Sequence, residues 1–222
     1  MRERRDRRYR LLVFDWDGTL ADSTDIIAEA LRGACADIGE PVPDPASARY
    51  VIGLGLRDAL MHVAPALPPE RYPELSEHYR RRFLARDPEI PLFAGARELL
   101  DDLAAAGYLL AVATGKTRVG LDRAMAASGL AARFHATRCA DESRPKPHPE
   151  MLHYLMDLLA VDAGSTLMIG DTTHDLELAR AAGAEAVAVA YGAHPPEGLA
   201  RLAPRATVHS VTELHAWLAA NA

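Results

Sequence analysis

Two aspartates stand one residue apart at the end of an apolar run, in the segment VFDWDGTL at residues 13–20. Asp15 and Asp17 follow a stretch that has the composition of a buried strand, and Gly18 marks a turn directly behind them. Alternate residues of an extended segment point the same way, so both carboxylates face one site while Trp16 points elsewhere. The pair predicts an acidic site at the mouth of a strand.

Further polar residues follow other apolar runs of the chain. Thr114 and Lys116 come after one such run, and Asp171 and Asp175 come after another, in GDTTHD. Lys146 stands in RPKPHPE, just before a helix pattern. In a doubly wound sheet the strand ends share one edge, so these residues are expected to converge although they lie far apart in sequence.

Carboxylates without a histidine or cysteine partner favour a hard cation. Mg²⁺ typically takes one or two protein carboxylates together with water and a substrate phosphate, so the natural substrate is a phosphoester. The metal and Lys146 would spread the charge of the transferring phosphoryl group. One aspartate can attack phosphorus and form an aspartyl-phosphate, and a second can protonate the leaving oxygen and then activate water. The paired carboxylates at 15 and 17 therefore suit two different roles.

The elements that position these residues alternate along the chain, which predicts a doubly wound, mostly parallel α/β sheet of Rossmann-like type. Four apolar runs are typical of buried parallel strands: 11–14, 109–113, 166–169 and 186–190. Helical periodicity indicates the helices 116–128, 149–160 and 173–182. A strand near 206–209 and a helix over 211–220 would close this unit.

The interval between the first two strands is too long for a single crossover. Helical patterns at 23–38, 57–63 and 70–85 occupy it, with proline-rich breaks between them. We therefore predict a small all-helical domain inserted into the sheet domain. The predicted organisation is a basic N-terminal tail at 1–10, a catalytic core at 11–21 and 88–222, and a helical cap domain at 22–87.

Composition limits the partners of the protein. The net charge is −6, and the tail at 1–10 carries six arginines, so the rest of the chain is more acidic than the total suggests. An acidic body argues against a nucleic-acid groove, and the tail is expected to be solvated, with a nucleic-acid or membrane contact as the alternative. No apolar run reaches about 18 residues. We expect a cytoplasmic protein, a monomer or homodimer, that binds no nucleic acid and no membrane.

Four segments carry a family resemblance. DWDGTL, VATGK, RPKPHPEM and IGDTTHDLELARAAG resemble the signature motifs of the haloacid dehalogenase-like hydrolase superfamily, in order and over nearly the whole chain. The resemblance implies that Asp15 is the nucleophile and Asp17 the general acid/base. It also implies that the inserted helices are the cap that such proteins carry between their first two motifs.

The other motifs complete the implied site. By resemblance, Thr114 and Lys146 bind and orient the phosphoryl group. Asp171 and Asp175 would complete a Mg²⁺ site with the two aspartates at 15 and 17, the second of which would also offer its backbone carbonyl. Gly115 stands where many relatives have asparagine, so the phosphate geometry and the substrate stay open.

The resemblance narrows the reaction. Members that cleave carbon–halogen bonds lack an aspartate at the position of Asp17, and β-phosphoglucomutases carry a histidine where this chain has Ile27. DGTLADS, VIGLGLRDAL and AYGAHPPEGLARLAP are similar to phosphoglycolate phosphatase-like members. The expected activity is a Mg²⁺-dependent phosphatase that hydrolyses a small phosphomonoester through an aspartyl-phosphate, with phosphoglycolate as a candidate. A phosphosugar mutase and a catalytically idle phospho-ligand-binding protein are the alternatives.

Three further residues are candidates for contact with the small phosphorylated metabolite. Gly115 and Lys116 would lie beside the phosphate, although Lys116 could equally be a solvated first-turn lysine. Arg57 follows two glycines in the insert and can grip a carboxylate bidentately, or it is an exposed arginine at a helix start. His174, inside the last motif, is expected at the surface.

Overall fold

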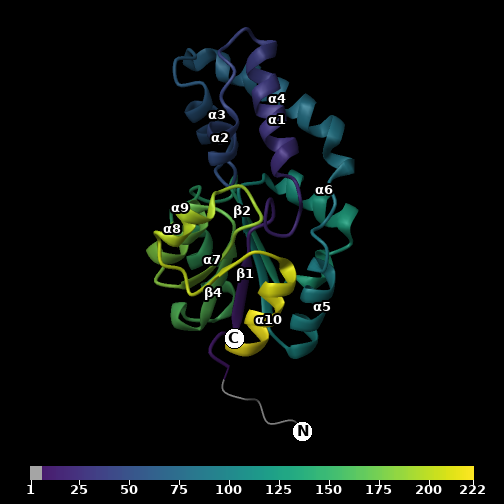
Figure 1. The fold of residues 1–222 in the computed structure, drawn as a ribbon, viewed down its shortest axis with the longest axis vertical. Helices are drawn as coiled ribbons and strands as arrows, with labels where there is room; N and C mark the ends of the chain where they lie inside the picture. Colours follow the sequence, from purple (N-terminus) through teal and green to yellow (C-terminus); the bar gives the residue numbers. More distant parts are fainter. Residues whose placement is uncertain (1–6) are drawn as a thin grey trace.

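The structure, a computed structural model, describes residues 7–222, which form a sheet domain with helices standing over one end of the sheet (Figure 1). Within these residues the sheet has six parallel strands in the order β3-β2-β1-β4-β5-β6. The strands span Leu11–Phe14 (β1), Leu109–Thr114 (β2), Ala136–Cys139 (β3), Thr166–Gly170 (β4), Glu185–Val189 (β5) and Thr207–Val208 (β6). The doubly wound α/β fold expected from the sequence is confirmed.

Helices cover both faces of the sheet (Figure 1). One face packs against α5 (Ala96–Ala106), α6 (Arg118–Ser128) and α10 (Val211–Asn221), and the other against α7 (Glu150–Leu159), α8 (Thr173–Ala181) and α9 (Pro196–Ala200). Alternate residues of β1 pack against helices on opposite faces of the sheet. Leu12 and Phe14 lie on the first face, and Leu11 and Val13 lie on the second. Because both faces are covered, this strand is an unbroken apolar run.

Four of the five α-helices between β1 and β2 in sequence stand above the sheet (Figure 1). They are α1 (Thr24–Asp37), α2 (Pro45–Tyr50), α3 (Leu56–Val63) and α4 (Tyr72–Arg86). Leu31, Leu60 and Leu75 belong to a hydrophobic cluster of these helices, separate from the two clusters of the sheet. We call this segment the helical insert. Short 3₁₀ turns span Pro69–Arg71, Asp87–Glu89, Ala131–Arg133 and Ala163–Ser165.

Some elements were not predicted, and their sequences explain why. The strand β3 reads ATRC, with two half-buried polar residues at the edge of the sheet, so it has no apolar run. The helix α2 begins at Pro45, and the side chain of Asp44 accepts hydrogen bonds from two backbone N–H groups of its first turn. This is an N-cap in a segment whose prolines favour a break. The helix α5 was also missed, although Leu99, Leu100 and Leu103 show helical spacing.

The N-terminal segment differs in part from the expected solvated tail. Residues 1–6 of the predicted tail lie outside the described residues. Tyr9 is fully buried in the sheet core, and Arg8 forms a 2.8 Å ion pair with Glu185 of β5. Tyr9 belongs to the same hydrophobic cluster as Leu12 and Phe14 of β1, so the core begins two residues before that strand. Among the helices of residues 7–222, none is long and apolar enough to cross a membrane.

Candidate active site

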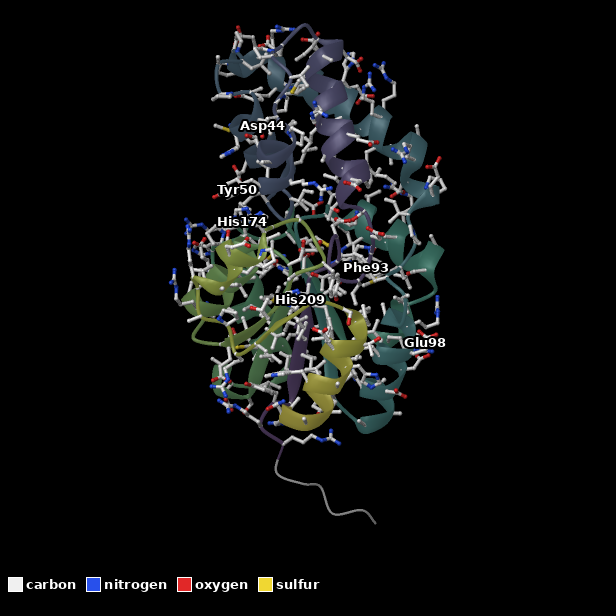
Figure 2. The ribbon with its side chains drawn as sticks, viewed as in Figure 1. Asp44, Tyr50, Phe93, Glu98, His174 and His209 are labelled. Carbon is white, nitrogen blue, oxygen red and sulfur yellow. The ribbon has the colours of Figure 1, made fainter. Side chains whose placement is uncertain are left out.

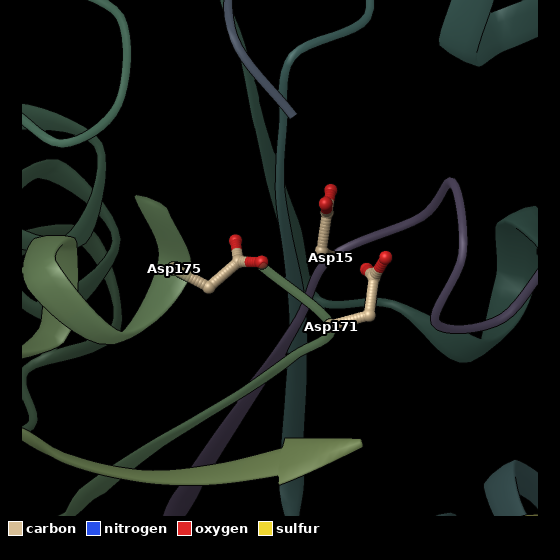
Figure 3. Close-up of side chains that lie close together, drawn as sticks. All are labelled: Asp15, Asp171 and Asp175. Carbon is tan, nitrogen blue, oxygen red and sulfur yellow. The ribbon is translucent and has the colours of Figure 1, made fainter. Parts of the chain in front are cut away.

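Asp15 and Asp171 follow neighbouring strands at the carboxyl edge of the sheet. Asp15 comes directly after β1 and Asp171 directly after β4, where the strand order reverses. Asp175 lies in the first turn of α8. One carboxylate oxygen from each of the three lies within 4.8 Å of the others, and Figure 3 shows the three side chains gathered at the strand ends. The fold thus joins residues that are far apart in sequence, as predicted.

Asp15 is held by one oxygen only. Its Oδ1 accepts a 2.6 Å hydrogen bond from the backbone N–H of Trp16 and lies 3.1 Å from Lys146 Nζ. Within residues 7–222, its Oδ2 is the buried side-chain atom for which no hydrogen-bond partner is found. A buried carboxylate oxygen without a partner costs free energy, so this atom indicates a place where a ligand binds.

Lys146 connects two of the carboxylates. Its Nζ lies 2.6 Å from Asp175 Oδ1 as well as close to Asp15, and the side chain is buried. Burial by itself lowers the pKa of Lys146, but the charges of Asp15 and Asp175 outweigh it and raise the pKa above the usual range. Lys146 therefore stays charged. The other oxygen of Asp175 accepts from Thr172 in a capping box, so Asp175 caps α8 while it faces the site.

Asp171 is fixed by contacts with two loops. Its Oδ1 accepts from Thr19 Oγ1 at 2.8 Å and its Oδ2 from the backbone N–H of Ala193 at 2.8 Å. Gly18 has φ +79°, and a Cβ there would lie 2.2 Å from Asp171 Oδ2. The glycine of the first motif is therefore required by both its backbone conformation and the closeness of this carboxylate.

The acidic cluster carries excess negative charge. Burial raises the pKa of Asp15 to about 7, with the charge of Lys146 opposing the rise and those of Asp175 and Asp17 adding to it. Burial also raises the pKa of Asp171 well above its usual range, and the Asp15 and Asp175 carboxylates add to it. Oxygen-only donors, an unpartnered oxygen and uncompensated charge fit a hard divalent cation. Asp15, Asp171 and Asp175 are the side chains that could hold one.

Asp17 lies beside this cluster, and its side chain does not belong to it. Its Oδ1 accepts from Ser23 Oγ at 2.7 Å and pairs with Lys116 Nζ at 3.0 Å. Lys116 Nζ also lies 5.0 Å from the ring centroid of Phe83, a residue of α4. Lys116 is thus directed into the site rather than into solvent. Ser23 is the N-cap residue of α1, but its hydroxyl makes no capping hydrogen bond and positions Asp17 instead.

A cavity of about 480 Å³ lies at these carboxylates and is lined both by residues at the strand ends and by residues of the helical insert. Asp15, Asp17, Thr114 and Lys116 line it from the sheet side. Thr114 is fully buried, and its Oγ1 accepts a 3.2 Å hydrogen bond from the backbone N–H of Lys116. We call this sheet side the floor of the cavity and the side formed by the helical insert its roof.

Gly115 is the point where the floor meets the helical insert. A Cβ at this position would lie 2.6 Å from the carbonyl oxygens of both Gly53 and Leu54. Those are backbone atoms, which cannot move aside as a flexible side chain can. A residue larger than glycine would therefore push the loop before α3 away from the floor, which gives a physical reason for glycine here.

Arg57 is not brought to the site. It is exposed and does not line the cavity, although Leu56 and Ala59 of the same helix do. The helix α3 begins at Leu56, and its inward face carries Leu56, Ala59 and Leu60. Successive helical residues point about 100° apart, so Arg57 faces outward.

A contact between the helical insert and the sheet domain was missed from the sequence. His174 Nε2 and His194 Nε2 both donate to the backbone carbonyl oxygen of Tyr50, at 2.8 and 2.9 Å. Each histidine is 4% exposed, so the expectation that His174 lies at the surface is wrong. Figure 2 shows Tyr50 and His174 together where the insert meets the sheet domain. We call these three residues the latch. His174 and His194 follow neighbouring strands, but nothing in the sequence indicates that both meet Tyr50 at the end of α2.

Comparisons with known proteins agree with this geometry. The family model described as haloacid dehalogenase-like hydrolase matches residues 12–189. The chain is 38% identical over 210 residues to the probable phosphatase IndB of Dickeya dadantii, covering 92% of this chain and 91% of that protein. It is 31% identical over 212 residues to a phosphoglycolate phosphatase of Cupriavidus necator, covering 93% and 92%.

A solved structure shows the same fold. The crystal structure of a predicted phosphatase from Clostridium acetobutylicum superimposes with a TM-score of 0.84 at 27% identity. The similarity covers 96% of this chain and 99% of that one, so both the sheet domain and the helical insert have counterparts in it.

Proposed function

The chain belongs to the haloacid dehalogenase-like hydrolase family and is a phosphatase of that family, and from this premise we propose how it acts. We propose that it hydrolyses a small phosphomonoester with Mg²⁺ and forms an aspartyl-phosphate on Asp15. The observation that carries this proposal is the Oδ2 atom of Asp15, buried without a partner at the floor of the cavity.

Asp15 is suited to nucleophilic attack. The Trp16 N–H and Lys146 fix its Oδ1, which orients the carboxylate and leaves one oxygen for the substrate side. A carboxylate oxygen of Asp15 would form a bond to phosphorus while the bond from phosphorus to the leaving oxygen breaks. Lys146 would offset charge on the phosphoryl group throughout, because its ammonium is buried and remains protonated.

Asp17 is suited to proton transfer. Its contacts with Ser23 and Lys116 both involve Oδ1, which leaves Oδ2 for the reacting oxygens. Asp17 would give a proton to the leaving oxygen, and it would then take a proton from the water that attacks the phosphorus of the aspartyl-phosphate. The bond between phosphorus and Asp15 breaks in that second step and releases inorganic phosphate.

Thr114 and Lys116 complete the phosphate site. Both line the floor of the cavity, and the Lys116 side chain is about nine-tenths buried beside Asp17. The Thr114 hydroxyl can donate to a phosphoryl oxygen while it accepts from the Lys116 N–H. Gly115 lies between them and admits the loop of the helical insert.

Mg²⁺ would be held by Asp15, Asp171 and Asp175, with the backbone carbonyl of Asp17 as a further donor. When bound, it supplies Lewis-acid stabilisation of the charge on the phosphoryl oxygens. Thr19 and the Ala193 N–H hold the Asp171 carboxylate in position for this role.

The helical insert at 22–87 would act as a cap that closes over a small phosphorylated metabolite and limits the access of bulk water. Ile27 lines the roof and offers no group for proton transfer, which supports a phosphatase over a phosphosugar mutase.

The test is phosphate release from a panel of phosphomonoesters, including phosphoglycolate, sugar phosphates and nucleotides. Wild-type protein is compared with Asp15→Asn, after EDTA treatment and again after Mg²⁺ is restored. Release that needs Mg²⁺ and falls at least about 10³-fold in Asp15→Asn is the expected result. Asp157→Asn, at an exposed position of α7, serves as the matched control and should keep wild-type rates. Full activity of Asp15→Asn would overturn the mechanism.

A further inference from the structure

The roof of the cavity is apolar. Ile27 and Leu31 of α1, Ile52 of the loop before α3, and Tyr79 and Phe83 of α4 all line it. The rings of Tyr79 and Phe83 stack with centroids 5.8 Å apart, which makes a broad aromatic wall. Two helices and one loop thus present, apart from the Tyr79 hydroxyl, hydrocarbon to the group that is attached to the phosphate.

The apolar wall begins next to the phosphate site. Phe83 lies 5.0 Å from Lys116 Nζ, and Lys116 in turn is paired with Asp17, the proposed proton donor to the leaving oxygen. The Lys116 ammonium thus lies over the ring of Phe83, so the aromatic wall starts directly beyond the ion pair of Lys116 and Asp17, within reach of the atoms that follow the leaving oxygen in a substrate.

Exposed apolar side chains continue the wall toward solvent. Val119 of α6 is 72% exposed and Leu84 of α4 is 45% exposed, and both line the cavity. When an apolar ligand covers exposed aliphatic side chains beside a cavity, their removal from water favours binding of that ligand.

Charged groups of the cavity do not offer a site for a second anion near the phosphate. Lys116 is paired with Asp17, and Arg123 is paired with Asp87. Asp141, which also lines the cavity, would repel an anionic leaving group. Arg80 lines the cavity as well, but it is exposed, so it can contact a polar group only at the solvent side.

From these observations we propose that the natural substrate is a phosphomonoester whose leaving group is apolar and at least as large as an aromatic ring. This inference rests on the proposed phosphatase function and names its substrate class. A volume of about 480 Å³ lies in the range of sites for whole organic ligands, and it exceeds the need of a two-carbon acid. Phosphoglycolate, the candidate from the sequence, thus becomes a poor fit.

The test compares leaving groups of equal chemical type. Ethyl phosphate, benzyl phosphate, 2-(1-naphthyl)ethyl phosphate and phosphoglycolate all release a primary alkoxide, so differences in kcat/KM report mainly the fit of the leaving group. The Mg²⁺-loaded protein should prefer benzyl over ethyl phosphate by at least about tenfold, and it should hydrolyse phosphoglycolate more slowly than benzyl phosphate. Equal rates for benzyl and ethyl phosphate, or a preference for phosphoglycolate, would overturn the inference and leave the phosphatase function intact.

A pair of double variants shows whether the preference comes from the cavity. Leu84→Ser with Val119→Ser removes the two exposed apolar side chains at the cavity, and should lower the benzyl-to-ethyl ratio at least about threefold. Val42→Ser with Leu158→Ser removes exposed apolar side chains elsewhere, at 48% and 57% exposure, and should leave the ratio unchanged. An unchanged ratio in the first variant would contradict the assignment of the apolar wall.

A binding measurement distinguishes a failure of this inference from a failure of the proposed phosphatase function. If no ester is hydrolysed, the proposed function fails, and calorimetry with benzylphosphonate and ethylphosphonate still tests the wall. Tighter binding of benzylphosphonate by about tenfold would support the apolar site, and equal binding would overturn it.

Discussion

The floor and the roof of the cavity are built in opposite ways. The floor presents Asp15, Asp17 and Lys116, with Asp171 and Asp175 buried beneath, and each polar group is held by hydrogen bonds or ion pairs. The roof presents hydrocarbon from helices that contribute no charged group near the phosphate. In the proposed function the floor binds the phosphoryl group, which is the same in every phosphomonoester. The roof would then contact the leaving group, which differs between them.

Because of this difference, substitutions in the floor and in the roof are expected to have different energetic costs. Changing a buried, charged floor residue leaves its partners unpaired in a low dielectric, so the cost is large and affects every substrate. Changing a roof residue alters contact area and closure, so the cost is smaller and depends on the substrate. The four predictions below test that contrast in order of expected effect.

Lys146→Met should have the largest effect. It leaves the carboxylates of Asp15 and Asp175 without their shared cation, so we expect kcat to fall about 10³-fold and the free energy of unfolding to fall by about 3 kcal/mol. Steady-state kinetics and urea unfolding measure the two losses. Arg144→Met, on the same loop but exposed, should change neither, and a Lys146→Met protein with more than a tenth of wild-type kcat would contradict the role of the floor.

Metal removal should destabilise the floor in a pH-dependent way. The pKa of Asp15 is raised to about 7, so the metal-free folded protein binds more protons than the unfolded chain between about pH 4 and 7. Its stability should therefore fall as pH rises through that window. At a fixed Mg²⁺ concentration that is 100 times its Kd at pH 8, Mg²⁺ contributes about 2.7 kcal/mol, or about 5–10 °C in Tm, and at pH 5.5 the same concentration should contribute less, because protons compete for the carboxylates.

Thermal unfolding in EDTA and in Mg²⁺ measures this effect. Asp171→Asn should lose most of the Mg²⁺-dependent rise in Tm, while Asp157→Asn should retain it. A rise of equal size at both pH values would show that protonation of the cluster does not compete with the cation.

Gly115→Ala tests the junction of floor and roof. Its Cβ would lie 2.6 Å from two backbone carbonyl oxygens of the insert, so the loop must move and kcat/KM should fall about ten- to hundredfold. The Mg²⁺-dependent rise in Tm should persist, because the carboxylates are untouched. Gly198→Ala, where a Cβ meets atoms only at 3.9–4.0 Å, is the matched control. Wild-type kcat/KM in Gly115→Ala would mean that closure does not need this contact.

His174→Phe should have the smallest effect. It removes one of the two hydrogen-bond donors to the Tyr50 carbonyl, while His194 remains as the other. We therefore expect the closed position of the insert to be destabilised by about 1 kcal/mol. Faster amide hydrogen exchange in α2 would report the opening, with His153→Phe on the exposed face of α7 as the control. Unchanged exchange in α2 would show that the latch does not hold the insert closed.

Five of the six strands, and the residues of the floor, could be predicted from the sequence. The strand β1 was predicted with its observed bounds, and the helices α7, α8 and α10 within one residue at each end. The family and the phosphatase activity expected from the motifs are confirmed. The strand β3 could not be recognised, because four residues at a sheet edge with half-buried polar side chains carry no apolar signal.

The sequence alone determined the chemistry of the floor, because that information is local. Asp15, Asp17, Thr114, Lys116 and Asp171 lie within three residues of a strand end, and Asp175 lies in the first turn of a helix. Their places therefore follow from a few neighbours and from the rule that parallel strands end at one edge. Only the tertiary structure decided the roof. It turned Arg57 outward, buried His174 under Tyr50, and set two carbonyl oxygens against Gly115. These outcomes depend on how helices from distant segments pack, and no pattern within one segment encodes that packing.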